Sequence, residues 1–281
     1  MSPAAVTGAP VREALDSAVD ALAAAGVEDP RLDAELLLAE ATGWSRATLV
    51  AEPEAEVSPA AGRRFGELVR RRLRREPVAY ILGHKGFRHL ELAVDRRVLV
   101  PRPETELLVE VALERRPARV LDVGTGSGAI ALAVADELPG CEVTASDTSP
   151  GALEVARANA QRLGLTERVR FVEGTLPEGE FDLILANLPY VPERDWPSLQ
   201  PEVTQWEPRE ALLAGPDGLD AYRAFIPSCA KHLGLAVEVG EGQAAAVAEL
   251  FREAGFAKVE TRRDLAGIER VVLGSGVGVG A

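Results

Sequence analysis

The sequence predicts an α/β protein with a doubly wound, mostly parallel sheet, preceded by a small helical bundle. Helical periodicity dominates residues 11–76, glycines separate short apolar runs in residues 77–100, and strand, glycine turn and helix alternate from residue 119. Such alternation is typical of a parallel sheet whose helices cover both faces. We therefore expect a helical domain at 1–76, a hairpin linker at 77–100 and an α/β domain at 101–281.

The N-terminal segments carry helix start and stop signals. The segment VREALDSAVDALAAAGV repeats apolar residues on one helical face, namely Val11, Leu15, Val19 and Leu22, and Gly26 indicates its end. Asp29-Pro30 and Ser58-Pro59 each combine a side-chain N-cap with proline at the first helical position. Pro77 ends this pattern, and the apolar runs of residues 79–101 suggest a strand pair.

The α/β domain is expected to contain seven strands and at least three helices. The predicted strands are 119–124, 141–146, 168–174, 181–186, 233–240, 257–264 and 269–274, the last two forming an antiparallel pair. The predicted helices are 129–138, 150–164 and 243–255. Sheets of this kind bind ligands at the carboxyl ends of their strands, where the strand order reverses.

Composition narrows the classes of protein to consider. With 281 residues, of which 47% are hydrophobic, the chain can bury a full core. Cys141 and Cys229 are far apart without Cys-x-x-Cys spacing, so we expect neither a disulfide framework nor a metal site. The sequence has no basic segment followed by an apolar leader and no run of eighteen apolar residues. We therefore expect a cytoplasmic protein that does not span a membrane.

The charge distribution disfavours nonspecific binding to nucleic acid. The net charge is −13, and residues 1–100, with 14 Lys and Arg against 15 Asp and Glu, leave −12 for residues 101–281. Such acidity repels phosphate backbones. The arginine-rich run at 70–75 is the exception, and we interpret it as the solvated end of a helix, with a docking patch for an acidic partner as the alternative.

Three glycines follow the first strand of the α/β domain, in the segment DVGTGSGAIA. Gly124, Gly126 and Gly128, with Thr125 and Ser127 between them, permit a tight turn in which backbone N–H groups approach a ligand. This spacing fits a nicotinamide dinucleotide, S-adenosylmethionine or a purely structural turn. The turn alone therefore leaves the ligand open.

Asp147 closes the second predicted strand, 23 residues after Gly124. An acidic side chain at this position can hold the two hydroxyls of a ribose, which both candidate cofactors contain. An equally simple explanation is a negative charge ahead of the helix that follows.

The segment Asn187-Leu188-Pro189-Tyr190 follows the fourth predicted strand and should emerge at the same edge of the sheet. Methylation of a planar nitrogen needs acceptors that hold the NH2 group in line with the methyl donor. Asn187 offers its side-chain oxygen, Leu188 its backbone carbonyl, and Tyr190 a ring face, while Pro189 stiffens the loop. A simple turn is the alternative, but the three motifs in order on successive strands favour S-adenosylmethionine and a grip for a planar NH2 group.

The sequence resembles the release-factor glutamine methyltransferases of the PrmC/HemK type over nearly its whole length. The resemblance rests on PVAYILG (77–83), VLVPRPETELLVE (98–110), VLDVGTGSGAIALA (120–133), NLPY (187–190), EPREALLAGPDGLDAYR (207–223) and DLAGIERVVLG (264–274). It implies a class I S-adenosylmethionine-dependent methyltransferase with a Rossmann-like sheet and an N-terminal domain that recognises the substrate. The implied reaction methylates the glutamine side chain in the Gly-Gly-Gln loop of class I peptide chain release factors.

The resemblance assigns roles to particular residues. Asn187, Leu188, Pro189 and Tyr190 would be catalytic, and no metal is implied. Cofactor binding would fall to the turn at 124–128 and to Asp147 and Asn187. The loop after the third strand, where the family often has aspartate, would add Thr175 and Leu176.

Leu188 also departs from the family, which usually has Asn-Pro-Pro-Tyr. Asn-Leu-Pro-Tyr also resembles the motif of ribosomal RNA adenine dimethyltransferases, so an adenine N-methyltransferase acting on RNA or DNA is the alternative function. A binding protein that has lost catalysis is a third. The acidic composition counts against direct binding of nucleic acid.

Overall fold

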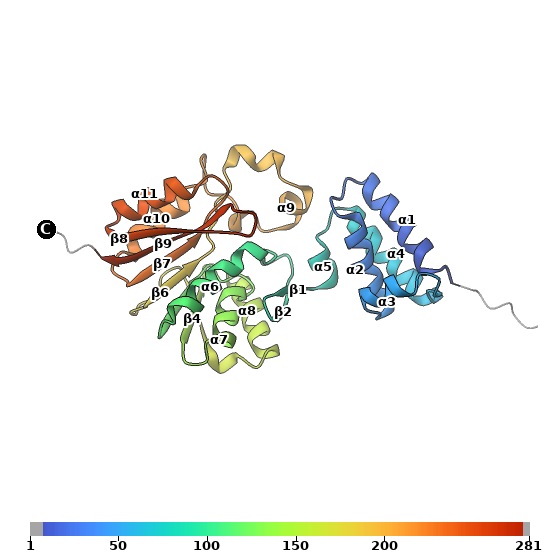
Figure 1. The fold of residues 1–281 in the computed structure, drawn as a ribbon, viewed down its shortest axis with the longest axis horizontal. Coiled ribbons are helices and arrows are strands. Elements are labelled where there is room, and N and C mark those ends of the chain that lie inside the picture. The colour runs from blue at the N-terminus through green and yellow to red at the C-terminus, as the bar shows by residue number, and fades with distance from the viewer. Residues whose placement is uncertain (1–7, 278–281) are drawn as a thin grey trace, which may run out of the picture. The chain divides into compact units, whose positions relative to one another are not determined.

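The computed structural model describes residues 8–277, which form two compact units (Figure 1). One unit contains the chain up to Gly83 together with Pro201–Trp206, and the other contains His84–Gln200 and the chain from Glu207 onward. The first unit is helical. Its helices are α1 (Val11–Ala24), α2 (Pro30–Thr42), α3 (Arg46–Ala51), α4 (Pro59–Leu73), α5 (Val78–Leu82) and α9 (Pro201–Trp206).

The predicted signals of the helical unit are mostly present. Val11, Leu15 and Leu22 are buried in α1, and the Ser58 side chain caps α4 by accepting a hydrogen bond from Ala61 N at 3.2 Å. The prediction for Asp29 was wrong in part, because its side chain makes no capping hydrogen bond although Pro30 begins α2.

The arginine-rich run at 70–75 is not simply a solvated helix end. Arg72 is buried, with its Nε 2.6 Å from Asp33 Oδ2 and its Nη1 2.6 Å from Glu202 Oε1. Arg75 also binds both oxygens of Glu202, at 2.7 and 2.6 Å. A buried charge is tolerated only when it is paired, so these contacts fix α9 within the helical unit.

The segment expected to begin a strand pair starts instead with a helix. Pro77 precedes α5, and Gly83 ends it in the left-handed conformation at φ +81°. The antiparallel pair then follows as β1 (His84–Phe87) and β2 (Leu90–Ala93). Short apolar runs do not distinguish a single helical turn from a strand, which explains the error.

The second unit contains a seven-stranded sheet in the order β5-β4-β3-β6-β7-β9-β8. Its strands are β3 (Arg119–Val123), β4 (Glu142–Asp147), β5 (Val169–Glu173), β6 (Leu183–Ala186), β7 (Gly234–Glu238), β8 (Phe256–Arg263) and β9 (Glu269–Val277). The first five are parallel, whereas β9 runs antiparallel to β7 and to β8. This confirms the predicted Rossmann-like sheet with its antiparallel last pair.

Helices cover both faces of this sheet, as Figure 1 shows. They are α6 (Glu106–Arg115), α7 (Ala129–Glu137) and α8 (Pro150–Arg162) on one face, with α10 (Asp220–Cys229) and α11 (Ala244–Glu253) on the other. In the described part of the chain, four short 3-10 helices lie in the connections: η1 (Pro103–Thr105), η2 (Thr166–Arg168), η3 (Glu193–Ser198) and η4 (Arg209–Ala211).

The strands β3, β6, β7 and β9 supply alternate residues to two apolar cores. In β6, Leu183 and Leu185 join one core, while Ile184 and Ala186 join the other. This alternation follows from the two-residue period of a strand. A strand buried on both faces therefore reads as a continuous apolar run, as LILA does.

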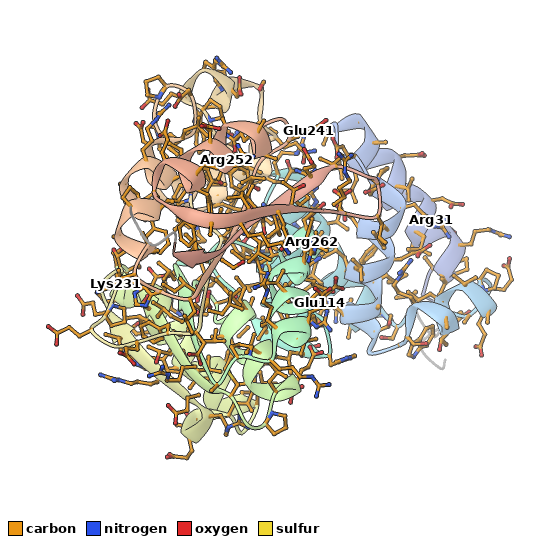
Figure 2. All side chains as sticks on the ribbon, turned by 60° about the vertical axis from the view of Figure 1, so that its left-hand side comes forward. Arg31, Glu114, Lys231, Glu241, Arg252 and Arg262 are labelled. Atoms are coloured by element: carbon orange, nitrogen blue, oxygen red, sulfur yellow. The ribbon has the colours of Figure 1, made fainter. Side chains whose placement is uncertain are left out.

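Charged side chains at the antiparallel edge pair with a neighbouring helix. Arg262 of β8 lies 3.6 Å from Glu114 of α6, and both side chains are labelled in Figure 2. Exposed pairs of this kind add little to stability. Within residues 8–277, no helix has the length and apolar composition of a membrane span, and no cluster of three His, Cys, Asp or Glu side chains could hold a metal ion.

Replacing Ser58 by alanine should lower the free energy of unfolding of the helical unit by about 1 kcal/mol, because α4 loses its side-chain cap. Asp29→Ala is the matched control, since Asp29 precedes a proline in the same way but makes no capping hydrogen bond. Urea denaturation followed by circular dichroism measures both variants. Equal losses would show that the Ser58 cap contributes nothing specific.

Candidate active site

The site residues lie where three neighbouring parallel strands end. The glycine turn follows β3, Asp147 ends β4, and Asn187 follows β6, and β3 pairs with β4 on one side and with β6 on the other. The chain order therefore reverses at β3, which is where open α/β sheets bind ligands. A Cβ atom at Gly124 would lie 3.6 Å from the Asn187 carbonyl oxygen, so the two loops are in contact.

A cavity of about 250 Å3 opens at this edge of the sheet. It is lined by nine of the twelve predicted site residues: Gly124, Thr125, Gly126, Ser127, Asp147, Thr175, Asn187, Leu188 and Pro189. It is also lined by Thr105, Glu210 and five residues of the preceding segment: Arg97, Val98, Leu99, Pro101 and Arg102. The cavity thus brings together the glycine turn, the acidic end of β4 and the Asn-Leu-Pro segment.

The remaining predicted residues, Gly128, Leu176 and Tyr190, are described by the structure but are not among the residues that line this cavity. Gly128 serves packing, because a Cβ atom there would approach Leu132 Cδ1 to 2.9 Å. Leu176 and Tyr190 pack, partly buried, against the apolar core formed by α10 and α11.

The backbone N–H groups of the glycine turn do not all face the cavity, contrary to expectation. Gly124 N and Thr125 N donate to the Ser146 carbonyl oxygen at 2.9 and 3.0 Å, and Gly128 N donates to Thr125 O. Gly126 N donates to Asp147 Oδ2 at 2.9 Å. The turn therefore uses these N–H groups to hold its own shape, and its glycines leave open the space that side chains would fill.

Asp147 shapes the turn as well as lining the cavity. Its Oδ2 accepts from Gly126 N, and its Oδ1 accepts from Ser149 N at 2.9 Å. A carboxylate oxygen has more than one lone pair, so both oxygens can still accept from a ligand hydroxyl. The two explanations of Asp147 are therefore compatible, since it lies ahead of α8 and also faces the cavity.

The loop after β6 is held on several sides. Tyr190 N and Val191 N donate to the Leu212 carbonyl oxygen at 3.1 and 2.8 Å, and Gln243 Nε2 donates to Tyr190 O at 2.9 Å. Leu188 is only 8% exposed and packs in the apolar core, which anchors the loop although it lacks a second proline. The segment 207–223 thus helps to shape the site, a role that its sequence did not reveal.

A polar cluster lies next to Asn187. Its Nδ2 donates to Thr105 Oγ1 at 3.1 Å, and Tyr190 OH lies 3.5 Å from Glu238 Oε1 at the end of β7. Burial raises the pKa of Glu238 to about 7, partly opposed by a hydrogen bond with Thr105. Thr105 and Glu238 were not among the predicted site residues. The signal for Glu238 was a glutamate at the carboxyl end of a predicted buried strand.

Two other acidic groups near the site, Glu207 and Asp122, were not predicted from the sequence either. Glu207 is 7% exposed and pairs with Arg102 at 2.5 Å, which connects the segment 97–102 to the segment after α9. Asp122 is fully buried, and its Oδ2 accepts from Thr125 Oγ1 at 2.6 Å and from Ala131 N at 3.1 Å. Its Oδ1 has no hydrogen-bond partner among the described residues, and burial raises the pKa of Asp122 to about 7.

Two models of protein families match the chain. The PrmC N-terminal domain matches residues 13–83, and a methyltransferase domain matches residues 120–206. The structure also resembles the hMettl16 catalytic domain, solved with the MAT2A 3′UTR hairpin 6, with a TM-score of 0.54. That likeness covers 67% of this chain and 77% of the other at 16% identity, so it supports the shared fold alone.

Whole-chain relatives are much more similar. The release factor glutamine methyltransferase of Geobacter sulfurreducens is 44% identical over 274 residues, which cover 94% of this chain and 96% of the relative. The protein of the same name from Moorella thermoacetica is 44% identical, covering 94% and 97%. That from Caulobacter vibrioides is 43% identical, covering 93% and 95%.

Asp122 and Glu238 should make the folded chain less stable as the pH rises. Each carboxyl has a higher pKa when folded, about 7 against 3.8 and 4.5, so folding favours its protonated form. The free energy of unfolding should therefore fall by roughly 2 kcal/mol per group between about pH 5 and pH 8.

Asp122→Asn tests this prediction, because the amide keeps an acceptor for Thr125 and Ala131 but does not titrate in this range. Urea denaturation at several pH values should show that the variant loses stability about half as steeply as the wild type. An unchanged slope would contradict the assignment of a raised pKa to Asp122.

Proposed function

The chain belongs to the release factor glutamine methyltransferase family, and we propose that it methylates the glutamine of the Gly-Gly-Gln motif in class I peptide chain release factors. The methyl donor is S-adenosylmethionine and the acceptor is the side-chain amide nitrogen. The observation that carries the proposal is the position of Asn187. Its planar amide lines the cavity beside the glycine turn, and Asp147 lines the same cavity.

The chemistry of the cavity fits this cofactor. Asp147 offers carboxylate oxygens for a ribose diol, Thr175 lies on the loop after β5, and Ile130 adds an apolar surface. When bound, S-adenosylmethionine supplies an electrophilic methyl group on a positively charged sulfur. The glycine turn leaves room for the cofactor to approach the backbone, since side chains are absent at Gly124 and Gly126.

Asn187 and Leu188 would act by alignment. The lone pair of an amide nitrogen is delocalised, so the nitrogen reacts only when it is held in line with the methyl group. The Asn187 Oδ1 atom and the Leu188 carbonyl oxygen would each accept one hydrogen of the substrate NH2 group, and Pro189 restricts the loop that carries them. Tyr190 would support this loop from its partly buried position, with its hydroxyl toward Glu238.

Residues 1–76 would recognise the release factor, the segment 77–100 would link the two parts, and residues 101–281 would perform the chemistry. The family model of the PrmC N-terminal domain supports a dedicated role for the helical part. Action in the cytoplasm follows from a substrate that works in translation. Nucleic acid is not expected to be a substrate, because residues 101–281 carry most of the net charge of −13.

Asn187→Ala should lower the single-turnover rate of methyl transfer by about a hundredfold or more, because the substrate NH2 loses one preorganised acceptor. Labelled S-adenosylmethionine is incubated with the wild type or the variant and with release factor, ribosomal RNA or DNA. The wild type should label only the release factor. Labelled RNA or DNA would favour the alternative function, an adenine methyltransferase. Methyl transfer by Asn187→Ala at the wild-type rate would show that the Asn-Leu-Pro-Tyr motif is only a turn.

Asp147→Ala should weaken binding of S-adenosylmethionine by on the order of 1.5–3 kcal/mol, because the ribose hydroxyls lose a charged acceptor. The matched control is Asp136→Ala, which removes an exposed carboxylate from α7 in the same unit. Isothermal titration calorimetry compares both with the wild type. Tight binding of NADH and none of S-adenosylmethionine by the wild type would overturn the assignment of the cofactor.

A further inference from the structure

To accept a hydrogen bond from a substrate NH2 group, the Asn187 side chain must point its oxygen, Oδ1, into the cavity. An amide has an acceptor at one end and two donors at the other, and only the acceptor end is useful here. The structure places Nδ2 3.1 Å from Thr105 Oγ1, which leaves Oδ1 available to the cavity. Something must hold the amide in this orientation, because the reversed amide would present two donors to another NH2 group.

Thr105 and Glu238 can supply that constraint. A threonine hydroxyl has one hydrogen to donate and lone pairs that accept, whereas an ionised carboxylate only accepts. The Thr105 hydroxyl opposes the rise in the pKa of Glu238, which places it beside the Glu238 carboxyl. When Glu238 is ionised, its negative charge favours a Thr105 hydroxyl whose hydrogen points toward the carboxylate. The Thr105 oxygen then accepts from its other neighbour, the Asn187 NH2 group, as the structure shows.

The cluster is built from three distant parts of the chain. Thr105 closes η1, Asn187 follows β6, and Glu238 ends β7. Thr105 is 4% exposed and Glu238 is 2% exposed. Such burial excludes water from the Thr105 hydroxyl and the Glu238 carboxyl, whereas Asn187 lines the cavity.

Few groups around Glu238 stabilise its carboxyl and thereby offset the free-energy cost of burying it. Its Oε2 has no hydrogen-bond partner among residues 8–277, and Tyr190 OH reaches only Oε1. The charges of Glu104 and Arg270 act on it in opposite directions, and Tyr222 OH bonds to its backbone oxygen rather than its carboxyl. A buried carboxyl with an unpartnered oxygen disfavours folding, so its presence calls for another explanation.

We propose that Thr105 and Glu238 are positioning residues that fix the orientation of the Asn187 amide, so that Oδ1 faces the substrate NH2 group. This inference rests on the proposed function for its consequence in catalysis. The orientation itself is a property of the free protein, which allows the two to be tested separately.

Single-turnover methylation of a release factor at saturating S-adenosylmethionine tests the catalytic consequence. Thr105→Val, which keeps the shape but removes the hydroxyl, should lower the rate about tenfold or more with little change in cofactor affinity. Thr105→Ser should restore the rate to within about threefold of wild type. Glu238→Gln should lower it at least about threefold, because a glutamine can also donate to Thr105.

Two controls separate positioning from general damage. Thr261→Val removes a part-buried hydroxyl that lies 3.0 Å from Glu269 Oε1, and it should leave the rate unchanged. In the Asn187→Ala background, Thr105→Val should slow the reaction by no more than about twofold, since the residue it positions is already gone. Additive losses in the double variant, or a wild-type rate for Thr105→Val, would overturn the inference.

A second readout needs no substrate. The side-chain NH2 resonance of Asn187, assigned by its loss in Asn187→Ala, should shift in Thr105→Val and keep its position in Thr105→Ser. An unchanged resonance in Thr105→Val would overturn the inference even if the enzyme is active. A shifted resonance would support the orientation even if no release factor is methylated, which would instead refute the proposed function.

Discussion

The parallel pairing of β3 with β4 on one side and β6 on the other is the constraint on which the site depends. It brings the ends of three strands to one edge, although Gly124, Asp147 and Asn187 are widely separated in the sequence. Hydrogen bonds then join the loops that leave this edge: Ser146 O accepts from Gly124 N and Thr125 N, and Asp147 accepts from Gly126 N. A change in the register of either strand pair would separate Gly124, Asp147 and Asn187 from one another, because each of them lies at the end of a strand.

The site also concentrates buried carboxyl groups that folding alone would not favour. Asp122 and Glu238 each have an oxygen without a hydrogen-bond partner among the described residues. Burial raises the pKa of both to about 7. By contrast, the buried Glu202 of the helical unit is fully paired with Arg72 and Arg75, and its pKa is lowered by these hydrogen bonds despite its burial. The paired Glu202 serves the structure of its unit, whereas the under-paired Asp122 and Glu238 lie near the predicted active site.

The sequence predicted the fold well because apolar periodicity and turn-forming residues act locally. Apolar runs such as LILA and the glycines after β3 specify strands and turns without reference to the rest of the chain. The cavity lined by Asn187 and Asp147 could also be anticipated, since parallel strands place their carboxyl ends together. Three features could not be anticipated from the sequence. Thr105 reaches Asn187 across 82 positions of sequence, α9 packs within the helical unit through Glu202, and the N–H groups of the glycine turn bond to Ser146 and Asp147. Each depends on tertiary contacts that no local pattern records.

We propose that Asn187 and Leu188 hold a glutamine side-chain amide at the cavity beside the glycine turn. The most direct measurement is a crystal structure of the protein with S-adenosylhomocysteine and a peptide that contains Gly-Gly-Gln. We expect the glutamine amide nitrogen within about 2.7–3.2 Å of both Asn187 Oδ1 and the Leu188 carbonyl oxygen, with Thr105 Oγ1 still bonded to Asn187 Nδ2. A glutamine bound elsewhere, or an Asn187 amide turned so that its oxygen faces Thr105, would contradict it.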